Sequence, residues 1–465
     1  MPKQDFIAAA IVGVAALSVL GLSELLRRFG ASKEVSRKAA HIGSGLLACC
    51  FPWLFESPLT VTVLCAGFGG LVLTAKHFGQ LQGVHGVERK SHGAVLFPVV
   101  IALLFWMTEG DPLLFSVPIL VLTVSDAVAA LIGKGYGAYH YKALGEQRSF
   151  EGSLAFFIVT FIAVHIPLLL SEQTPRLDAV LIAVLIAVLA TCVEAISVRG
   201  LDNLFIPMLV TYGLTNFLDY SSAEIVDRTL ATCGFGAFCI LPRRLGFMTH
   251  TGAIAGFLCL YASYSLGGAA FAIPLFSFFV ALLVLAFVLS RQTPVEPIGL
   301  SRVVQALVVE VFLVMMWANN PQPELYLAYL AALAGTSALV IGRLGGHLGS
   351  LRGAGRQSTL LTGIAGAALI CGAGAQFLTV PTNQSVLIAF LGGIACLVLV
   401  AILRLTTAQF HCEVCNLRGG EPRHCGEPTT LTSGHRYWTA NRAAMTSIAL
   451  VAVVVWAVSR TTVFA

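Results

Sequence analysis

The chain has 465 residues, of which 57% are apolar and only 11% carry a charge. A water-soluble domain of this length keeps a far more charged surface, so the composition excludes a soluble protein and indicates a polytopic membrane protein. The formal net charge of +5 is modest and follows from membrane topology, so we expect no nucleic-acid partner.

Apolar runs recur along the whole chain, and most are close to the roughly 20 residues that an α-helix needs to cross a bilayer. We therefore predict an all-α transmembrane bundle of about 16 spans, surrounded by the lipid bilayer. The predicted spans, in chain order, are 6–25, 40–55, 59–74, 94–108, 113–132, 154–170, 179–196, 204–218, 225–241, 251–265, 268–290, 303–318, 325–342, 360–377, 385–403 and 443–458.

Lys and Arg are distributed unevenly between the predicted loops. With an exterior N-terminus, most of the 28 Lys and Arg residues fall in cytoplasmic loops, where such residues collect. The basic residues on the other side are Lys3, Arg176, Arg228 and Arg460. We therefore predict that the N-terminus is exterior and that the polar stretch 125–153 lies on the cytoplasmic side.

Ionisable residues at the ends of predicted spans are frequent up to residue 241 and rare beyond it until the C-terminal loop, with Glu310 as the main exception. Ionisable groups at membrane depth are costly and usually mark function. The change near LPRRLG (241–246) predicts two membrane domains, 1–244 and 245–465. We expect the chemistry in the first domain.

The stretch 125–153 combines acids, cations and glycines. Asp126 and Glu151 flank its loop, and Lys134 and Arg148 lie within it. Carboxylates beside cations suit a magnesium-nucleotide site, although no Walker A sequence is present. Glycines let backbone amides approach an anion closely. The glycines of this loop are Gly133, Gly135 and Gly137.

Several basic candidates also have a structural explanation. A role in fixing membrane topology explains Arg37, Lys38 and Arg89 as well as a phosphate site does. His41 follows Lys38 by three residues on the same helical face. It suits a buried structural histidine as well as a catalytic or phosphate-binding one.

Some of the acidic candidates also have a structural explanation beside the functional one. Asp126 suits a helix cap or a residue of the bundle interior, although an acid within a span usually has a function. Asp202 and Asn203 suit N-caps of the following span. Glu194 lies eight residues before Asp202 and has no such explanation. We therefore predict metal or nucleotide contact for Glu194 and Asp202.

Four elements of the first domain are SRKAAHIGSG (36–45), ERKSHGAVLFPVV (88–100), SDAVAALIGKGYGAYHY with RSFEGSLAFF (125–157) and VEAISVRGLDNLFIPM (193–208). In this order they resemble the motifs of the membrane-embedded CTP-dependent polyprenol kinases, the family that contains dolichol kinase and phytol kinase. The resemblance implies transfer of the γ-phosphate of CTP or another nucleotide to a long-chain isoprenoid alcohol. The acceptor would be phytol, farnesol, geranylgeraniol or a polyprenol, and the product its monophosphate.

The same resemblance implies roles for the polar residues. Asp126, Glu151 and Asp202 would hold Mg²⁺, and His41 would orient or deprotonate the acceptor hydroxyl. Arg148 stands where the family commonly has Lys, and its planar guanidinium differs from an ammonium in phosphate geometry. The predicted nucleotide and phosphate contacts are Gly133, Lys134, Gly137, Arg148, Ser149, Gly152, Ser153, Glu194, Asn203, Arg37, Lys38 and Arg89.

The second domain contains MTHTGAIAGFLCL (248–260) and a tail rich in Cys and His (412–441). These elements resemble the domain of the plastid phytyl-phosphate kinase and its prokaryotic relatives. Within AGTSALVIG (334–342), Gly335 stands for that family's Asp and Val340 for its Glu. Without acids to hold magnesium we expect a degenerate domain, and the monophosphate as the only product.

The C-terminal loop 411–442 has the spacing of a small zinc knuckle. Thiolates and imidazole can hold a structural Zn²⁺ tetrahedrally. The candidate ligands are Cys412, Cys415, His424 and Cys425. Adjacent His424 and Cys425 rarely both bind one ion, so His411 competes as the fourth ligand, and reduced thiols without a metal are the alternative.

Two other functions fit such a chain. A carrier or lipid translocator would explain the many spans, although transporters more often show inverted repeats and helices broken at mid-membrane. A CDP-lipid synthase, which is a cytidylyltransferase, also has acids and Lys near the cytoplasmic face. The fate of labelled CTP separates the three functions.

Overall fold

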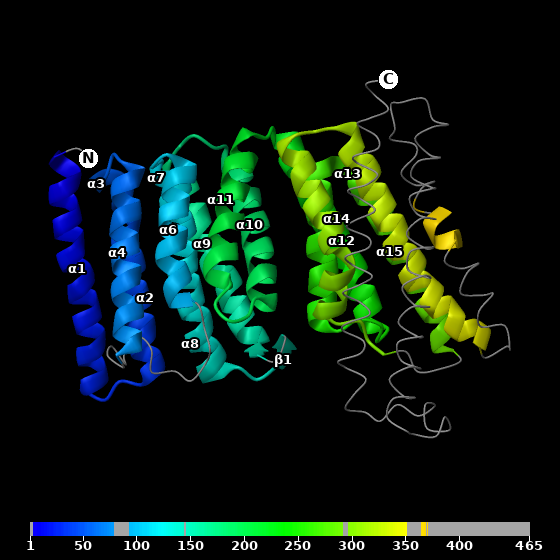
Figure 1. The fold of residues 1–465 in the computed structure, drawn as a ribbon, viewed down its shortest axis with the longest axis horizontal. Helices are drawn as coiled ribbons and strands as arrows, with labels where there is room; N and C mark the ends of the chain where they lie inside the picture. Colours follow the sequence, from blue (N-terminus) through cyan, green and yellow to red (C-terminus); the bar gives the residue numbers. More distant parts are fainter. Residues whose placement is uncertain are drawn as a thin grey trace, which may run out of the picture. The chain divides into compact units, whose positions relative to one another are not determined.

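A computed structural model of the chain describes residues 3–78, 93–143, 146–291, 296–350, 364–368 and 370. Helices dominate these ranges (Figure 1). The chain divides into two compact units, Met1–Cys233 and Gly234–Ala465. The predicted site residues outside the described ranges are Arg89, His411, Cys412, Cys415, His424 and Cys425.

The first unit is built mainly from helices, and most of the described connections between them are short. In chain order they are α1 (Lys3–Arg28), α2 (Lys33–Cys49), α3 (Phe51–Leu54), α4 (Pro58–His77), α6 (Gly93–Thr108), α7 (Pro112–Leu120), η1 (Val121–Ser125), α8 (Asp126–Tyr136), α9 (Phe150–Leu170), α10 (Arg176–Ile196) and α11 (Asp202–Asp219). Short connections make successive helices neighbours. Accordingly α1 packs against α2, α4 packs against α6, and α9 packs against both α8 and α10.

Among the described residues, nine helices are long and apolar enough to cross a membrane, and Val95–Thr108 is a shorter apolar helix. These helices agree with the prediction of a multi-pass membrane protein. The predicted count of about 16 spans is not confirmed. The predicted spans 385–403 and 443–458 lie outside the described residues.

α2 begins seven residues before the apolar span that the sequence predicts at 40–55. Ser32 caps this helix, because its hydroxyl accepts a hydrogen bond from the backbone N–H of Val35 at 3.3 Å. The polar residues before this span are therefore helical. The first three turns of α2 carry Arg37, Lys38 and His41 on a rigid element rather than on a loop.

The helical segment Pro112–Tyr136 changes geometry in its middle. η1 is a π-helical turn between α7 and α8, and it ends immediately before Asp126. Such turns are rare and frequently occur at functional sites. α2 approaches η1 closely at Gly45, where a Cβ atom would overlap the buried side chain of Thr123. Only glycine fits at this contact.

The all-α prediction missed a β-hairpin between α8 and α9. β1 (His140–Ala143) pairs antiparallel with β2 (Glu146–Ser149), and Tyr141 lies opposite Arg148. Each strand has four residues, and most of them are polar. An alternation of apolar and polar residues is therefore not visible in the sequence.

Close packing joins α8, the hairpin and α9. Ser149 at the end of β2 caps α9, because its hydroxyl accepts a hydrogen bond from Gly152 N at 3.1 Å. A Cβ atom on Gly152 would lie 3.0 Å from Ala129 O and 3.2 Å from Gly133 Cα. A Cβ atom on Gly137 would lie 2.8 Å from Ser149 Cβ. The sequence predicts phosphate contacts for these glycines, and in the fold they permit this close packing.

The second unit begins within α12 (Ser222–Arg244). Its other helices are α13 (His250–Ser290), α14 (Leu300–Asn319) and α15 (Pro323–Ser350). α13 contains the two predicted spans 251–265 and 268–290, and Gly268 interrupts its helical geometry with a φ of 69°. On α14, the buried carboxylate of Glu310 accepts a hydrogen bond from Thr336 of α15 at 2.7 Å.

We expect Gly45→Ala to destabilise the protein by about 1–3 kcal/mol, because the new methyl group overpacks against Thr123. Thermal unfolding in detergent measures the effect. Gly21→Ala on α1 is the matched control, since a Cβ atom there meets no described atom within 4 Å. Equal stability of the two variants would contradict the close contact between α2 and η1.

Candidate active site

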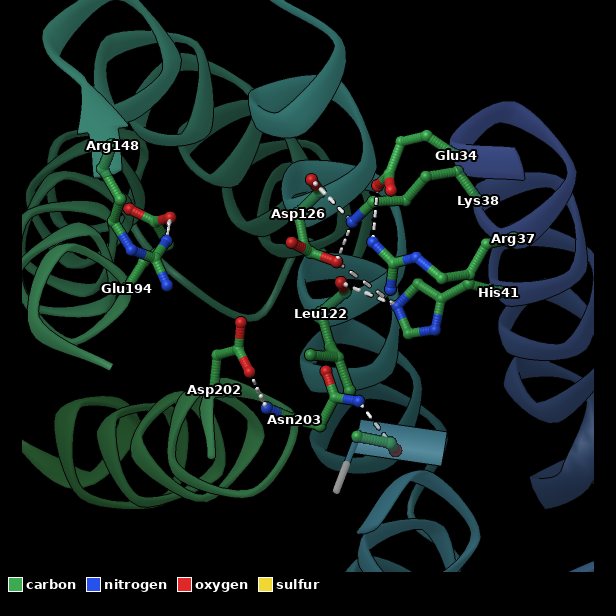
Figure 2. A network of polar contacts seen from close by, with 11 residues as sticks. Glu34, Arg37, Lys38, His41, Leu122, Asp126, Arg148, Glu194, Asp202 and Asn203 are labelled. Carbon is green, nitrogen blue, oxygen red and sulfur yellow. Dashed lines mark hydrogen bonds and ion pairs between the residues drawn. The ribbon is translucent and has the colours of Figure 1, made fainter. Parts of the chain in front are cut away.

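Polar side chains from α2, α8 and α11 point toward one another in Figure 2, and a polar pair from β2 and α10 lies beside them. All these elements belong to the first unit. The carboxylate cluster is the set Lys38, His41, Asp126 and Asp202. The arginine clamp is the pair Arg148 and Glu194.

The centre of the carboxylate cluster is a buried ion pair. Lys38 Nζ donates to Asp126 Oδ2 at 2.5 Å and lies 3.3 Å from the backbone carbonyl oxygen of Asp126. Lys38 is only 3% exposed, so Asp126 rather than water stabilises the positive charge of its amine. A topology anchor would extend its amine to the membrane surface. Lys38 instead turns into the bundle.

His41 lies on the same face of α2, one turn beyond Lys38. Its Nε2 is 3.8 Å from Asp126 Oδ2 and 3.5 Å from the carbonyl oxygen of Leu122 in η1. Its ring lies against the ring of Phe97, with 4.9 Å between the ring centres. The imidazole therefore stands between the Asp126 carboxylate and an apolar wall.

Arg37 is held by Glu34, a residue that the sequence analysis missed. Arg37 Nη2 lies 2.5 Å from Glu34 Oε1 on the same helix. Burial alone would raise the pKa of the Glu34 carboxyl, but the hydrogen bond and charge of Arg37 lower that pKa below its ordinary value. The spacing of three residues between an acid and a cation was the available signal in the sequence.

Asp202, the second acid of the carboxylate cluster, stands at the start of α11 (Figure 2). Asn203 N donates to Asp202 Oδ1 at 3.1 Å, and the Asn203 side-chain amide donates to Gly93 O at 2.9 Å. Burial raises the pKa of the Asp202 carboxyl, and the negative charge of Asp126 raises it further. Two carboxylates that repel each other in this way form a site that favours a cation.

The arginine clamp uses two nitrogens of one guanidinium. Arg148 Nη1 donates to Glu194 Oε1, and Arg148 Nη2 donates to the carbonyl oxygen of Ser197 at 2.8 Å. Lys has a single nitrogen at the end of a flexible stem and would not reach both acceptors in this planar arrangement. Arg148 stands where the resemblance leads us to expect Lys, and its guanidinium bridges β2 and the end of α10.

The clamp continues into the hairpin through hydroxyl groups. Ser153 Oγ is 3.5 Å from Glu194 Oε2 and 2.8 Å from the hydroxyl of Tyr141 in β1. Tyr141 and Ser197 were missed by the sequence analysis, because their roles depend on the hairpin. No sequence signal marks that hairpin.

Some predicted site residues lie apart from the carboxylate cluster. Glu151 accepts hydrogen bonds from Tyr139 N at 3.1 Å and 3.3 Å, and no contact among the described residues joins it to Asp126 or Asp202. Lys134 is exposed at the end of α8, near enough to Glu34 to act on its carboxylate. Ser149, Gly133, Gly137 and Gly152 lie in the packed junction of α8, the hairpin and α9.

Two acids of the cluster have the donor chemistry that Mg²⁺ prefers. Within the described ranges, no group of three or more His, Cys, Asp and Glu residues is placed to hold a metal ion. Mg²⁺ at nucleotide sites is usually held by one or two carboxylates together with phosphate oxygens and water. Asp126 and Asp202 supply two such carboxylates.

Sequence comparison shows that the chain is similar to a protein described as a phytol kinase. The chain is 30% identical over 204 residues to the phytol kinase of Synechocystis sp. (strain ATCC 27184 / PCC 6803 / Kazusa). The aligned part covers 42% of this chain and 87% of that kinase. No family model matches the chain. No solved structure matches it either.

We expect Arg148→Gln to lower the free energy of unfolding by about 3 kcal/mol, because it leaves the buried carboxylate of Glu194 without its cation. Arg148→Lys should lose less, since it keeps the charge and one of the two contacts. Arg302→Gln is the matched control, because its pair with Glu296 is exposed, and it should cost at most about 1 kcal/mol. Reversible unfolding in mixed micelles measures all three. Equal losses for Arg148→Gln and Arg302→Gln would contradict the clamp.

In the absence of Mg²⁺ and nucleotide, Asp202→Asn should raise the midpoint of thermal unfolding at neutral pH. The wild-type carboxyl has a raised pKa, so its ionisation opposes folding above that pKa and has no such effect once the group is protonated. The gain should therefore shrink as the pH is lowered. Asp219→Asn, at the exposed end of α11, is the matched control and should leave the midpoint at neutral pH nearly unchanged. A loss of stability at neutral pH would contradict the raised pKa.

Proposed function

The chain belongs to the phytol kinase family, and on this premise we propose that it transfers a phosphoryl group from a nucleotide to the hydroxyl of a long-chain isoprenoid alcohol. The proposed donor is CTP, and the proposed product is the monophosphate. The proposed acceptors are phytol, farnesol, geranylgeraniol and polyprenols. The reaction would take place at the carboxylate cluster, on the cytoplasmic side of the membrane.

The observation that carries the proposal is the ion pair of Lys38 and Asp126 with a second carboxylate, Asp202, beside it. Phosphoryl transfer depends mainly on positioning the reactants and neutralising the charge of the phosphates. The two carboxylates would hold Mg²⁺, which would neutralise phosphate charge, and the neighbouring amine of Lys38 could pair with the same phosphates. This arrangement therefore supports a kinase better than a passive lipid carrier.

We assign the Mg²⁺ to Asp126 and Asp202. With Asp126 engaged in holding the ion, Lys38 could pair with a phosphate oxygen instead, so that its buried charge would stay paired. Arg37 and Arg148 are the further cations on either side of the cluster. Glu151, which the sequence predicts as a third ligand, receives a positioning role through its bonds to the loop at Tyr139.

His41 is our candidate for the residue that orients or deprotonates the acceptor hydroxyl. A general base must lie within hydrogen-bond reach of the proton that it accepts. The imidazole lies beside Asp126 on one side and against Phe97 on the other. A hydroxyl at this ring would therefore be close to the proposed metal ion, while the carbon chain of the alcohol extends over Phe97.

The second unit is proposed to have no kinase activity of its own. Gly335 and Val340 occupy the positions where the resemblance leads us to expect magnesium-binding acids. Without such acids a second transfer lacks the charge neutralisation that the triphosphate requires. We therefore propose the monophosphate as the end product and a packing or regulatory role for the second unit.

The decisive experiment follows the phosphates of CTP. Purified protein is incubated with Mg²⁺, one isoprenoid alcohol, and CTP that is labelled at either the γ- or the α-phosphate. We expect γ-label in a lipid that carries a single phosphate. Lipid labelled from the α-phosphate would show a CDP-lipid synthase instead, and no labelled lipid from either would favour a carrier. A lipid diphosphate would show that the second unit is active.

Asp126→Asn should lower the rate of phosphorylation by roughly a hundredfold or more, because it removes a charge that holds the metal ion. Asp219→Asn is the matched control and should keep most of the activity, since Asp219 lies at the other end of α11. Size-exclusion chromatography in detergent checks that the variants are folded. The double variant Asp126→Asn/Lys38→Met avoids an unpaired buried amine and should be equally inactive. Substantial activity in folded Asp126→Asn protein would overturn the assignment.

A further inference from the structure

We infer that an apolar cavity between α1, α2, α4 and α6 holds the isoprenoid chain of the acceptor alcohol. This inference rests on the proposed function and gives the hydrocarbon part of the substrate a place in the first unit. The cavity has a volume of about 450 Å³. Pockets that bind small molecules span roughly 300–1,000 Å³.

The wall of the cavity consists almost entirely of hydrocarbon. Leu47 of α2, Phe68 of α4 and Ile101 of α6 represent its lining, and no charged side chain of the described residues takes part. The hydroxyl of Thr60, which is also part of the wall, donates to Asp5 Oδ2 at 2.8 Å. Such a wall suits a hydrocarbon chain and offers nothing to the phosphates or base of a nucleotide.

The cavity begins next to the carboxylate cluster. Ser44 lines it and follows His41 by three residues on α2, which is about one helical turn. Phe97 also lines the cavity. Its ring lies against the ring of His41, with 4.9 Å between the two ring centres. A ligand that fills the cavity can therefore place its polar end at His41 and Asp126.

The wall then extends along the helices, away from the cluster. On α2 it reaches from Ser44 to Ala48 and continues to Phe51 at the start of α3, and on α1 it reaches from Phe6 to Leu17. The eleven residue steps on α1 correspond to roughly 16 Å at about 1.5 Å per residue. This elongated shape suits a linear chain that lies parallel to the helices.

The cavity opens to the side of the helical bundle. Three of its wall residues are largely exposed: Phe6 at 73%, Leu17 at 55% and Val63 at 55%. Exposed apolar side chains on a helix that is apolar all round face lipid in a membrane protein. An isoprenoid alcohol can therefore enter the cavity from the bilayer in which it is dissolved.

Two glycines in the wall make the inference testable. Gly13 of α1 and Gly67 of α4 line the cavity, and a Cβ atom on either meets no described atom within 4 Å. A larger side chain at these positions would fill the cavity without a clash with the backbone. Gly21 and Gly70 lie on the same two helices, also face open space and do not line the cavity.

The experiment compares Gly13→Leu and Gly67→Leu with the matched controls Gly21→Leu and Gly70→Leu. The measured quantity is kcat/KM for geraniol, farnesol and geranylgeraniol, with CTP and Mg²⁺. We expect the two cavity variants to lose about tenfold or more with geranylgeraniol and much less with geraniol, because only the longer chain needs the filled space. The controls should keep the wild-type preference. Cavity variants that match their controls with every alcohol, while the wild type is active, would overturn this inference and leave the proposed function standing.

A binding measurement separates the two proposals. A photoreactive geranylgeraniol analogue, cross-linked to the wild-type protein in lipid vesicles, should label peptides of α1, α4 and α6. Free geranylgeraniol should compete with this labelling, and Gly13→Leu should reduce it. Labelling of these helices by a protein that phosphorylates no alcohol would overturn the proposed function alone. Labelling elsewhere, or equal competition by a phospholipid, would overturn the inference about the cavity.

Discussion

The buried ion pair of Lys38 and Asp126 is the contact on which the polar end of the first unit depends. α2 can carry an amine into an apolar bundle only because α8 presents a carboxylate there, and either charge alone would cost several kcal/mol. Gly45 lies two turns beyond Lys38 on the same face of α2, where it lets the helix approach η1. Charge thus fixes α2 against α8, and shape fixes α2 against the adjoining turn η1.

The arginine clamp joins the hairpin to α10 through a charged pair, as Lys38 joins α2 to α8. Arg148 fastens β2 to the end of α10 through two acceptors, while Glu151 holds the loop at Tyr139 from the other side. The hairpin buries little apolar area and needs such polar fastening. Asp202 stands between the pair of Lys38 and Asp126 and the pair of Arg148 and Glu194 (Figure 2). The charges of Asp126 and Arg148 both act on its carboxyl.

The sequence is informative where one physical rule dominates. Apolar runs predict most helices of the first unit within a few residues, because the bilayer dictates both length and composition. Acids are rare within such runs, and this rarity directs attention to Asp126 and Glu194. The hairpin and η1 could not be predicted, because they leave no periodic pattern. The partner of Arg37 has a signal, its spacing from Glu34, but this spacing becomes meaningful only once α2 is known to begin at Lys33.

The π-helical turn η1 also sets the direction in which Asp126 points. A π turn places one residue more in a helical turn than an α-helix does, and each residue of an α-helix advances by roughly 100° around the axis. Everything after Ser125 is therefore shifted in phase by about that angle relative to an uninterrupted continuation of α7. α7 can turn its apolar face to the core, while α8 directs the first carboxylate toward α2. Removal of one residue from η1 would preserve the composition and the length of the span almost unchanged, yet it would rotate Asp126 away from Lys38.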